Sequence, residues 1–434
     1  MQRYLRSIAV AAAVLAALAA ATTGASASDA TQRHAARPTD FSGVNLVISR
    51  WAGDPWQAAT TTDAAAWAKL TGASASVDAL PYENLQQKQV LTLSSGGDYD
   101  IVYVHPSWFG QYAKAGYLAP IGTYLNDPSL AVGGSGSSTF LPAILKQGAY
   151  NGQQYCLQDF VGTDLLAYRT DVFKANHLKP PVTTADVIAD AKLLNGKKGM
   201  AGISLPGKRT GAVADLMSSL LAGLGTWWYS PSGASTLNVA KATQAVTFYQ
   251  QAAKYAPSGI LNYHVDEAAT AAAQGKAAMV IVNTPSFARL NDPKQSKTVG
   301  KWAYIPLAMS KGHPGGELIY WNWCVSAKSK NPQAAYSLIR YLTAKDQQAS
   351  IAQTAYTAGA TTDFYKDTAL TKKLAFLPAM NQALTHSQPQ PSIAQWPKLQ
   401  DTIELQVQYA ITGKKTPAQA AKAMKAALDA GLRS

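Results

Sequence analysis

The chain has 434 residues, and its 38 Lys and Arg against 25 Asp and Glu give a formal net charge of +13. This length is enough for two compact units with separate hydrophobic cores. The lysines are scattered through expected helices and loops instead of clustering with aromatic residues on one element, so nucleic-acid binding is not expected. We interpret the charge as a feature of solubility and surface potential.

The N-terminus has the pattern of a secretory signal peptide over residues 1–27. Arg3 and Arg6 precede an apolar run at 8–21, and an Ala-Ser-Ala cleavage motif follows. The run is too alanine-rich and too short-flanked to favour a permanent anchor. Because neither cysteine lies near the cleavage motif, the lipobox of a lipid-anchored protein is absent. We expect a flexible leader at 28–40 and a soluble mature chain, which suits a Gram-negative periplasm.

Strands and helices alternate in the first part of the expected mature chain. Strands are predicted at 44–49, 74–80 and 98–104, and helices at 63–70 and 82–93. This alternation is typical of an α/β protein with a largely parallel sheet covered on both faces. In such sheets the ligand lies beyond the carboxyl ends of the strands. The polar and aromatic residues that follow strands at that edge are Trp51, Asp54, Trp56, His105 and Trp108.

The two cysteines, Cys156 and Cys324, both lie in strand-like runs, 168 positions apart. An oxidising compartment permits a disulfide between them, and two buried free thiols are an equally natural outcome. The six histidines form no ligand-spaced pair and have no Cys-x-x-Cys motif beside them, so we expect neither a metal site nor a cofactor.

The segment 267–293 contains a strand-to-helix junction. An alanine-rich helix ends near Gly275, a buried strand follows at 277–282, and the run from Asn283 breaks this strand before a helix begins at Phe287. Such a junction turns backbone N–H groups and an aromatic ring toward whatever lies beyond the strand end.

The sequence of this segment resembles that of the sugar-type (family 1) solute-binding proteins of ABC importers. That family usually has G-K-A-A-M, a strand and N/G-G-x-W here, and this chain has Thr284 for the glycine and Phe287 for the tryptophan. The run from Tyr150 resembles the family's Y-N-G-K-x-Y-G-L-P, with Cys156 for glycine and Gln158 for proline. Further landmarks match in order at 221–229, at 315–326 with Trp321 on the family's tryptophan, and at 411–420.

The resemblance implies a two-lobed periplasmic binding protein fold of type II, in which each lobe is a mostly parallel sheet flanked by helices and a hinge joins the lobes. The implied lobes are 41–153 with 286–342, and 154–285 with 343–434. The resemblance also implies that the protein is not an enzyme. It would bind a carbohydrate, either a sugar or a sugar alcohol, as a monomer and deliver it to the membrane subunits of an ABC permease.

The chemistry of a sugar suggests which residues contact it. A pyranose has apolar faces, which indole rings cover, and a hydroxyl rim, which carboxylates and amides satisfy. Each tryptophan could instead pack in the core, and each polar residue could instead cap a helix or form a turn. The expected ligand-binding residues are Trp51, Asp54, Trp108, Asp159, Asp164, Trp227, Asn283, Phe287, Trp321 and Trp396.

Two other classes of protein remain as alternatives. A secreted carbohydrate-active hydrolase needs a close pair of carboxylates, and the only acidic pair near a strand end is Asp98 and Asp100, at a strand start. Neither a G-x-S-x-G nor an HExxH motif occurs. A binding protein for a non-sugar solute is the other alternative. Within it, a polyamine ligand is disfavoured because the chain has few acidic residues.

Overall fold

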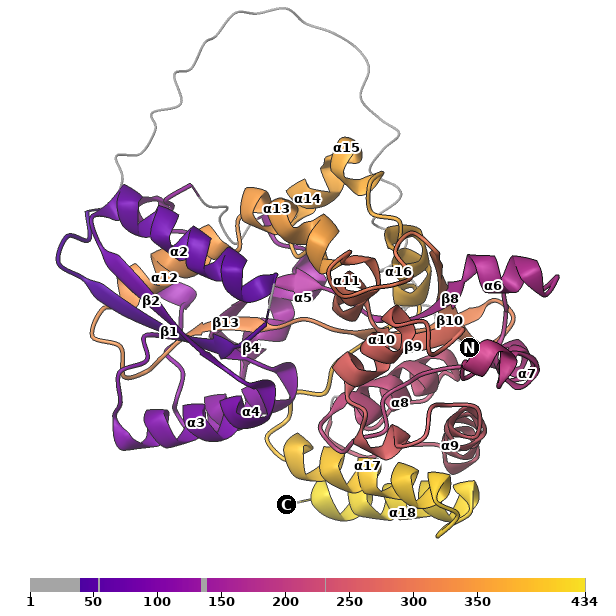
Figure 1. Cartoon of the computed structure of the whole chain (residues 1–434). Coiled ribbons are helices and arrows are strands. Elements are labelled where there is room, and N and C mark those ends of the chain that lie inside the picture. The colour runs from indigo at the N-terminus through magenta and orange to yellow at the C-terminus, as the bar shows by residue number, and fades with distance from the viewer. Residues whose placement is uncertain (1–39, 54, 134–138, 231, 434) are drawn as a thin grey trace, which may run out of the picture. The chain divides into compact units, whose positions relative to one another are not determined.

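The computed structural model describes residues 40–53, 55–133, 139–230 and 232–433, and Figure 1 traces their helices and strands. The predicted signal peptide at 1–27, nearly all of the predicted leader at 28–40, and Asp54 therefore lie outside the described residues. Within the described ranges, no helix combines the length and apolar character that are needed to cross a bilayer.

The first sheet has five strands in the order β2-β1-β3-β13-β6. β2, β1 and β3 run parallel, whereas β13 runs antiparallel to both β3 and β6. The strand-helix alternation predicted for this part of the chain is confirmed. The strands are β1 Asn45–Trp51, β2 Ser74–Leu80, β3 Ile101–Val104, β6 Cys156–Gln158 and β13 Asn322–Val325.

Helices cover both faces of this sheet. α2 and α12 contact each other and pack on β2 and β13, and Figure 1 shows α3 and α4 on the opposite face. α2 and α3 end at Gly72 and Gly96, whose φ angles of 74° and 80° glycine adopts without strain. The helices are α2 Trp56–Thr71, α3 Tyr82–Ser95, α4 Pro106–Lys114 and α12 Pro332–Leu342.

The second sheet has four strands in the order β11-β10-β8-β9. Its neighbouring strands are antiparallel, and two parallel bridges join Ser204 to Val280 in β9 and Ala201 to Ala277 just before it. The mixed helix-and-sheet class is confirmed, but a mostly parallel second sheet was wrong. The reason is that β8 is buried along its length and takes both neighbours from segments that return in the opposite direction. The strands are β8 Asp164–Arg169, β9 Met279–Asn283, β10 Trp302–Ser310 and β11 His313–Gly315.

A second cluster of buried apolar side chains joins this sheet to its helices. α17 and α18 pack against each other and against α9 (Figure 1). The longer helices with side chains in this cluster are α7 Thr184–Leu194, α8 Ala212–Gly223, α9 Val239–Ala253, α17 Trp396–Ile411 and α18 Pro417–Gly431. Three other helices contribute to the buried cluster that also holds the core of the first sheet: α10 Val265–Ala273, α13 Lys345–Ala355 and α16 Leu377–Leu384. The short elements used below are β7 Phe160–Val161, η8 Thr284–Phe287, α6 Thr170–Ala175, α11 Ala288–Asn291, β12 Glu317–Leu318 and β15 Gln388–Pro389.

Two segments that connect the sheets run side by side. Asp159 N–H donates to the Trp321 carbonyl at 3.0 Å, and Gly162 N–H donates to the Ile319 carbonyl at 2.8 Å. Cys156 and Cys324 face each other in the β6–β13 ladder and form a disulfide, so of the two alternatives that the sequence left open the structure has the bridge. The bridge ties the connecting segments together where they enter the first sheet.

Strand pairing differs from the predicted lobe ranges at two places. The range 286–342 was assigned to the first lobe, but β10 pairs with β8 in the second sheet. The range 154–285 was assigned to the second lobe, but β6 pairs with β13 in the first sheet. The physical reason is that β8 and β13 are buried strands that need a hydrogen-bonded neighbour on each edge.

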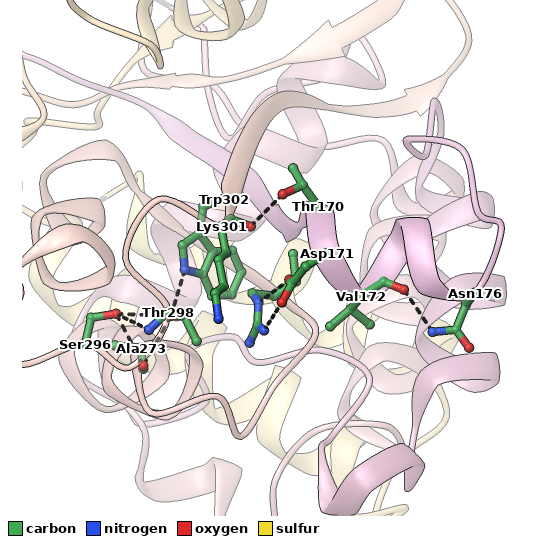
Figure 2. A network of polar contacts seen from close by, with 10 residues as sticks. Thr170, Asp171, Val172, Asn176, Ala273, Ser296, Thr298, Lys301 and Trp302 are labelled. Atoms are coloured by element: carbon green, nitrogen blue, oxygen red, sulfur yellow. Dashed lines mark hydrogen bonds and ion pairs between the residues drawn. The ribbon is translucent and has the colours of Figure 1, made fainter.

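A polar network closes the end of the second sheet opposite Asp164, and Figure 2 shows it from close by. Trp302 donates its indole N–H to Thr298 Oγ1 at 2.9 Å, and Thr170 Oγ1 donates to the Lys301 carbonyl at 3.2 Å. Arg169 pairs with Asp171 at 2.6 Å. These contacts hold α6 and the start of β10 against the end of β8. The network therefore stabilises the end of the sheet that lies away from Asp164.

Candidate functional site

A cavity of about 870 Å³ lies between the residues that follow the strands of the first sheet and the α10 to α11 region of the second. From the first side come the segment after β1, Tyr82 after β2, and His105 after β3. From the second side come the start of α10 and the residues that follow β9. The volume falls in the range of pockets for small molecules, and the location at strand ends is the one expected for an α/β protein.

Aromatic rings form much of the cavity wall. Trp321 stacks on Tyr103 with ring centroids 4.8 Å apart and an interplanar angle of 19°. Its centroid also lies 5.0 Å from His105 and 6.2 Å from Trp51. Tyr82 stacks on His264 at 5.3 Å, which brings the two sides of the cavity into contact. The six aromatic residues in the lining are Trp51, Trp56, Tyr82, Phe160, Trp321 and Tyr356.

A buried arginine supports this wall from behind. The Arg50 guanidinium lies 4.9 Å from the Trp51 ring and 5.2 Å from the Tyr103 ring, and it donates to the Trp56 carbonyl at 2.7 Å. Tyr103 donates its hydroxyl to Asp159 Oδ2 at 2.6 Å. Burial raises the pKa of Asp159, and the Tyr103 hydrogen bond and the Arg50 charge oppose that rise. The polar groups thus fix the orientation of rings that face the cavity.

Charged groups in the lining are mostly acidic. Glu83 forms an ion pair with Lys208, and Asp266 forms one with Arg289 at 3.2 Å. The lining carboxyl groups are Glu83, Asp215, Asp266, Glu267 and Asp292, and the lining guanidinium is that of Arg289.

The other three lining carboxylates accept hydrogen bonds from uncharged donors. Asp215 Oδ1 accepts from Gln390 Nε2 at 2.9 Å, and Glu267 Oε2 accepts from the His264 backbone N–H at 2.8 Å. Asp292 accepts from the Lys294 backbone N–H at 2.9 Å and from the side-chain amide of Gln295 at 2.6 Å.

Three further carboxyl groups lie behind Asp215, which is the first acidic residue of α8. Asp164 accepts from Ser219 Oγ at 2.7 Å, and Glu404 accepts from three backbone N–H groups at the start of α8, the shortest from Gly211 at 2.8 Å. Glu317 is fully buried beside them. Helix N-terminal N–H groups are natural partners for carboxylates.

Loss of bulk water and mutual repulsion make these carboxyl groups harder to ionise. Burial raises the pKa of Asp215 to about 7, with a smaller contribution from Asp164. Burial likewise raises the pKa of Asp164 to about 6 and that of Glu404 to about 8. The pKa of Glu317 is raised well above its usual value by burial and by the charges of Asp215 and Asp164. Near neutral pH Glu317 and Glu404 therefore hold protons that exposed carboxyls would have lost, Asp215 is partly protonated, and Asp164 is mostly ionised.

The histidines of the lining are uncharged at neutral pH. Burial lowers the pKa of His105 to about 3, and its Nδ1 lies 2.7 Å from Ser107 Oγ. Burial also lowers the pKa of His264, against the nearby charges of Asp266 and Glu267. Over the part of the chain that the structure describes, no group of three His, Cys, Asp or Glu residues is arranged to hold a metal ion.

Three of the predicted ligand-binding residues line the cavity: Trp51, Asn283 and Trp321. Asn283 also caps η8, since its Oδ1 accepts from the Ser286 N–H at 3.3 Å. Trp108 lies just outside the lining, 7% exposed, with its ring centroid 5.8 Å from that of Trp321.

The other described residues of the prediction are not brought to this cavity. Asp159 lies beneath Tyr103, and Asp164 lies behind Asp215. Phe287 is fully buried with its ring 4.7 Å from Tyr304. In each case the residue is next to the expected edge, but its side chain points inward to a partner in the core.

The two tryptophans of the second part of the chain belong to its core cluster. Trp396 is 1% exposed and packs 5.6 Å from Trp228, so it is a core residue and not a stacking platform. Trp227 packs against the same cluster and does not line the cavity. The reason is that α8, α9 and α17 leave an apolar space between them, which large rings fill.

Several lining residues were missed by the sequence prediction. Tyr82 follows β2 at the same sheet edge as Trp51, so the strand-end rule would have found it. Asp215, His264 and Glu267 lie in the first turns of α8 and α10 or cap them, where acidic residues usually indicate only a helix start. Tyr356 follows α13 in a segment without a strand-end pattern.

Comparisons with known proteins agree with this architecture. A protein from Deinococcus radiodurans, described as a probable ABC transporter-binding protein, is 27% identical over 84% of this chain and 88% of its own length. Solved structures with a similar fold include a solute-binding protein from Thermotoga lettingae with bound α-D-tagatose, which has a TM-score of 0.80 and 21% identity over 90% of this chain and 100% of that one.

Two further solved structures are similar over most of their length. A solute-binding protein from Agrobacterium radiobacter in complex with ribitol has a TM-score of 0.78 and 24% identity over 90% of this chain and 100% of that one. A maltose-bound protein from T. maritima has a TM-score of 0.78 and 20% identity over 89% of this chain and 99% of that one. The fold expected from the sequence, a two-lobed binding protein, is thereby confirmed.

The family model for bacterial extracellular solute-binding proteins matches residues 53–349, which include the second sheet, every strand of the first sheet except β1, and the two segments that connect the sheets. The chain belongs to the family of bacterial extracellular solute-binding proteins.

Proposed function

We propose that this protein binds a carbohydrate, a sugar or a sugar alcohol, in the cavity and delivers it to the membrane subunits of an ABC importer. The observation that carries the proposal is the cavity itself. Six aromatic rings offer apolar faces for a sugar ring, and carboxylates and an amide between them can accept hydrogen bonds from its hydroxyls. Solved structures of similar fold hold tagatose, ribitol and maltose, which supports a ligand of this class.

The proposal includes a conformational step. The cavity takes residues from both sheets, and two antiparallel segments joined by the disulfide connect the sheets. A ligand that contacts both sides would favour the closed arrangement over an open one, with the connecting segments as the hinge. No covalent chemistry is part of this cycle, and ATP hydrolysis belongs to the importer.

The proposed location is the periplasm, reached through a signal peptide that is cleaved, with the mature protein free of a lipid anchor and monomeric. The signal pattern at 1–27 and the family support a location outside the cytoplasm. The lobes are proposed as 41–153 with 286–342 and 154–285 with 343–434, except that β10 is assigned to the second lobe and β6 to the first, which their pairing with β8 and β13 supports.

A thermal-shift screen of the mature protein tests the proposal, because a ligand that binds only the folded state raises the melting midpoint. The screen would contain monosaccharides, disaccharides, polyols and polyamines, and calorimetry would follow each hit. We expect a sugar or polyol to raise the midpoint with 1:1 stoichiometry. A hit confined to polyamines, or turnover of an oligosaccharide by the protein, would contradict the proposal.

A further inference from the structure

The cavity is acidic in a chain that is basic overall. Its described lining has five carboxyl groups, one guanidinium and no lysine, whereas the whole chain has 38 Lys and Arg against 25 Asp and Glu. The two lining histidines add no positive charge at neutral pH, because burial lowers the pKa of each. A low-dielectric cleft lined by one sign of charge attracts a ligand of the opposite sign.

Not all of this charge is neutralised by the protein. Glu83 and Asp266 have Lys208 and Arg289 as partners, but Asp215, Glu267 and Asp292 accept hydrogen bonds from uncharged amide groups. Of these three, Asp215 lines the cavity together with His105, and Gln390 Nε2 contacts both, since it donates to Asp215 Oδ1 at 2.9 Å and lies 3.4 Å from His105 Nε2.

A second observation concerns the region behind Asp215. Asp164, Glu317 and Glu404 are 4%, 0% and 2% exposed, and none of the ion pairs among the described residues joins any of them to Lys or Arg. A buried carboxylate is stable only with hydrogen bonds and a nearby positive charge. Here Asp164 and Glu404 accept hydrogen bonds, whereas both buried side-chain oxygens of Glu317 lack a hydrogen-bond partner within the described part of the chain. Asp215 is the member of this group that reaches the cavity.

The aromatic walls are compatible with a positive charge. The faces of indole and phenol rings attract ammonium groups, and the same faces cover the apolar face of a sugar ring. A hydroxylated ring that carries an amine would use both properties of the lining at once, whereas a polyamine would use only the attraction for ammonium groups and has no ring face to stack on the aromatic walls.

We propose, on the basis of the proposed carbohydrate function, that the ligand is an amino sugar with a protonated amine and that Asp215 accepts the hydrogen bonds of its ammonium group. Glu267 and Asp292 contribute negative charge at the other side of the cavity. The carboxylate of Asp215 thereby acts as a specificity determinant that favours the amine over the hydroxyl or the acetamide at the same ring position.

The proposal implies that binding releases a proton. Around Asp215, the ionisable groups on the elements packed against α8 are Asp164 on β8, Glu317 on β12, Tyr249 on α9 and Glu404 on α17, with Tyr82 and His105 on the cavity side. The structure places no cation among them, and the pKa of Asp215 is raised to about 7. An ammonium group beside Asp215 favours its ionised form, so part of the protein population loses a proton on binding.

A matched series of ligands tests the proposal with the wild-type protein. The β-1,4-linked disaccharides of glucosamine, of N-acetylglucosamine and of glucose have the same rings and differ at C2, as do the corresponding three monosaccharides. Calorimetry would be run at about pH 6.5, below the usual pKa of an amine of this kind, in two buffers of different ionisation enthalpy. We expect the amine to bind roughly 10- to 100-fold more tightly than its neutral counterparts and to release protons.

Variants assign the effect to a residue. Asp215→Asn keeps the shape and removes the charge, and we expect it to abolish the preference for the amine. Asp429→Asn removes one carboxylate on α18, far from the lining in sequence and absent from it, and is the matched control. If Asp215→Asn does not fold, two measurements still test the charge of the site. They are the preference of Glu267→Gln for the amine over its neutral counterparts, and the proton release by the wild type.

The outcomes separate this inference from the proposed function. Neutral sugars that bind as tightly as the amines would overturn the inference and leave the carbohydrate function standing. Spermidine or putrescine binding in the absence of any sugar binding would overturn both. A thermal-shift and calorimetry panel in which no sugar or amino sugar binds would also reject both. A preference for the amine that Asp215→Asn retains would reject Asp215 as the determinant.

Discussion

Trp321 and Trp323 allow a direct test of which aromatic residue contacts the ligand. Both rings pack on Tyr103, with centroids 4.8 and 4.1 Å away, and they are 7% and 1% exposed. Only Trp321 lines the cavity. Trp321→Ala and Trp323→Ala therefore remove rings of the same size from the same cluster, and they differ in whether the ring also reaches the ligand.

The two variants are expected to separate stability from affinity. Loss of a buried tryptophan costs about 3–5 kcal/mol of the free energy of unfolding, so both variants should melt at a lower temperature than the wild type. Loss of a stacking contact with the sugar costs about 1–3 kcal/mol, so Trp321→Ala should weaken sugar affinity roughly 5- to 150-fold. Trp323→Ala should change the affinity little where the protein is still folded.

The assay has two parts. Thermal unfolding without ligand gives the stability of each variant, and calorimetry with the best-binding sugar, at a temperature where all three proteins are folded, gives the affinity. Equal losses of affinity in the two variants would refute the assignment of Trp321, because the effect would then come from general disturbance of the cluster. Unchanged affinity in Trp321→Ala would place the ligand elsewhere.

Three further predictions concern stability. Asp215 and Glu404 have pKa values raised to about 7 and about 8, so the folded state keeps protons that the unfolded state releases; the melting midpoint should fall as pH rises from about 6.5 to about 8, above the range in which the lowered pKa values of His105 and His264 act in the opposite direction, and a Glu404→Gln variant should show a shallower fall. A midpoint that rises over this window would contradict the argument. Replacing Cys156 and Cys324 by serine should cost about 2–4 kcal/mol, and dithiothreitol should lower the midpoint of the wild type but not of the variant. Gly315→Ala should cost about 1–3 kcal/mol, since its Cβ would lie 2.2 Å from the Gly223 backbone nitrogen, whereas Gly122→Ala, with open space around it, is the control that should melt like the wild type.

The sequence pattern located the edge of the sheet where the cavity lies but not the direction of every side chain. The strand-end rule placed Trp51, His105 and Trp108 at one edge because each stands at or just after the end of a parallel strand of the first sheet, and in the structure all three rings lie around Trp321. The rule does not specify rotamers. Phe287 begins at the right place after β9, yet its ring turns to Tyr304 because the 3₁₀ turn η8 points it inward.

Long-range pairing was the other part that local patterns did not determine. β10 pairs with β8, more than a hundred residues earlier in the chain, and no pattern in the sequence of β10 indicates that partner. The same holds for the group behind Asp215, whose members come from β8, α8, β12 and α17. Each looks like an ordinary helix-start, strand or helix residue until the fold brings the four together.

The small number of acidic residues in the whole chain was used as an argument against a polyamine ligand, but the charge that matters to any cationic ligand is the charge of the cavity lining. Composition averages over the whole surface, whereas a ligand meets only the residues that line its site. Although the chain has only 25 acidic residues, five of them line the cavity. The lysines that dominate the net charge are absent from the described lining. At physiological ionic strength, charges more than about 8 Å away across solvent are largely screened. The distant lysines therefore do little to offset the field that a ligand meets beside Asp215, and the local charge of the cavity is the quantity that selects it.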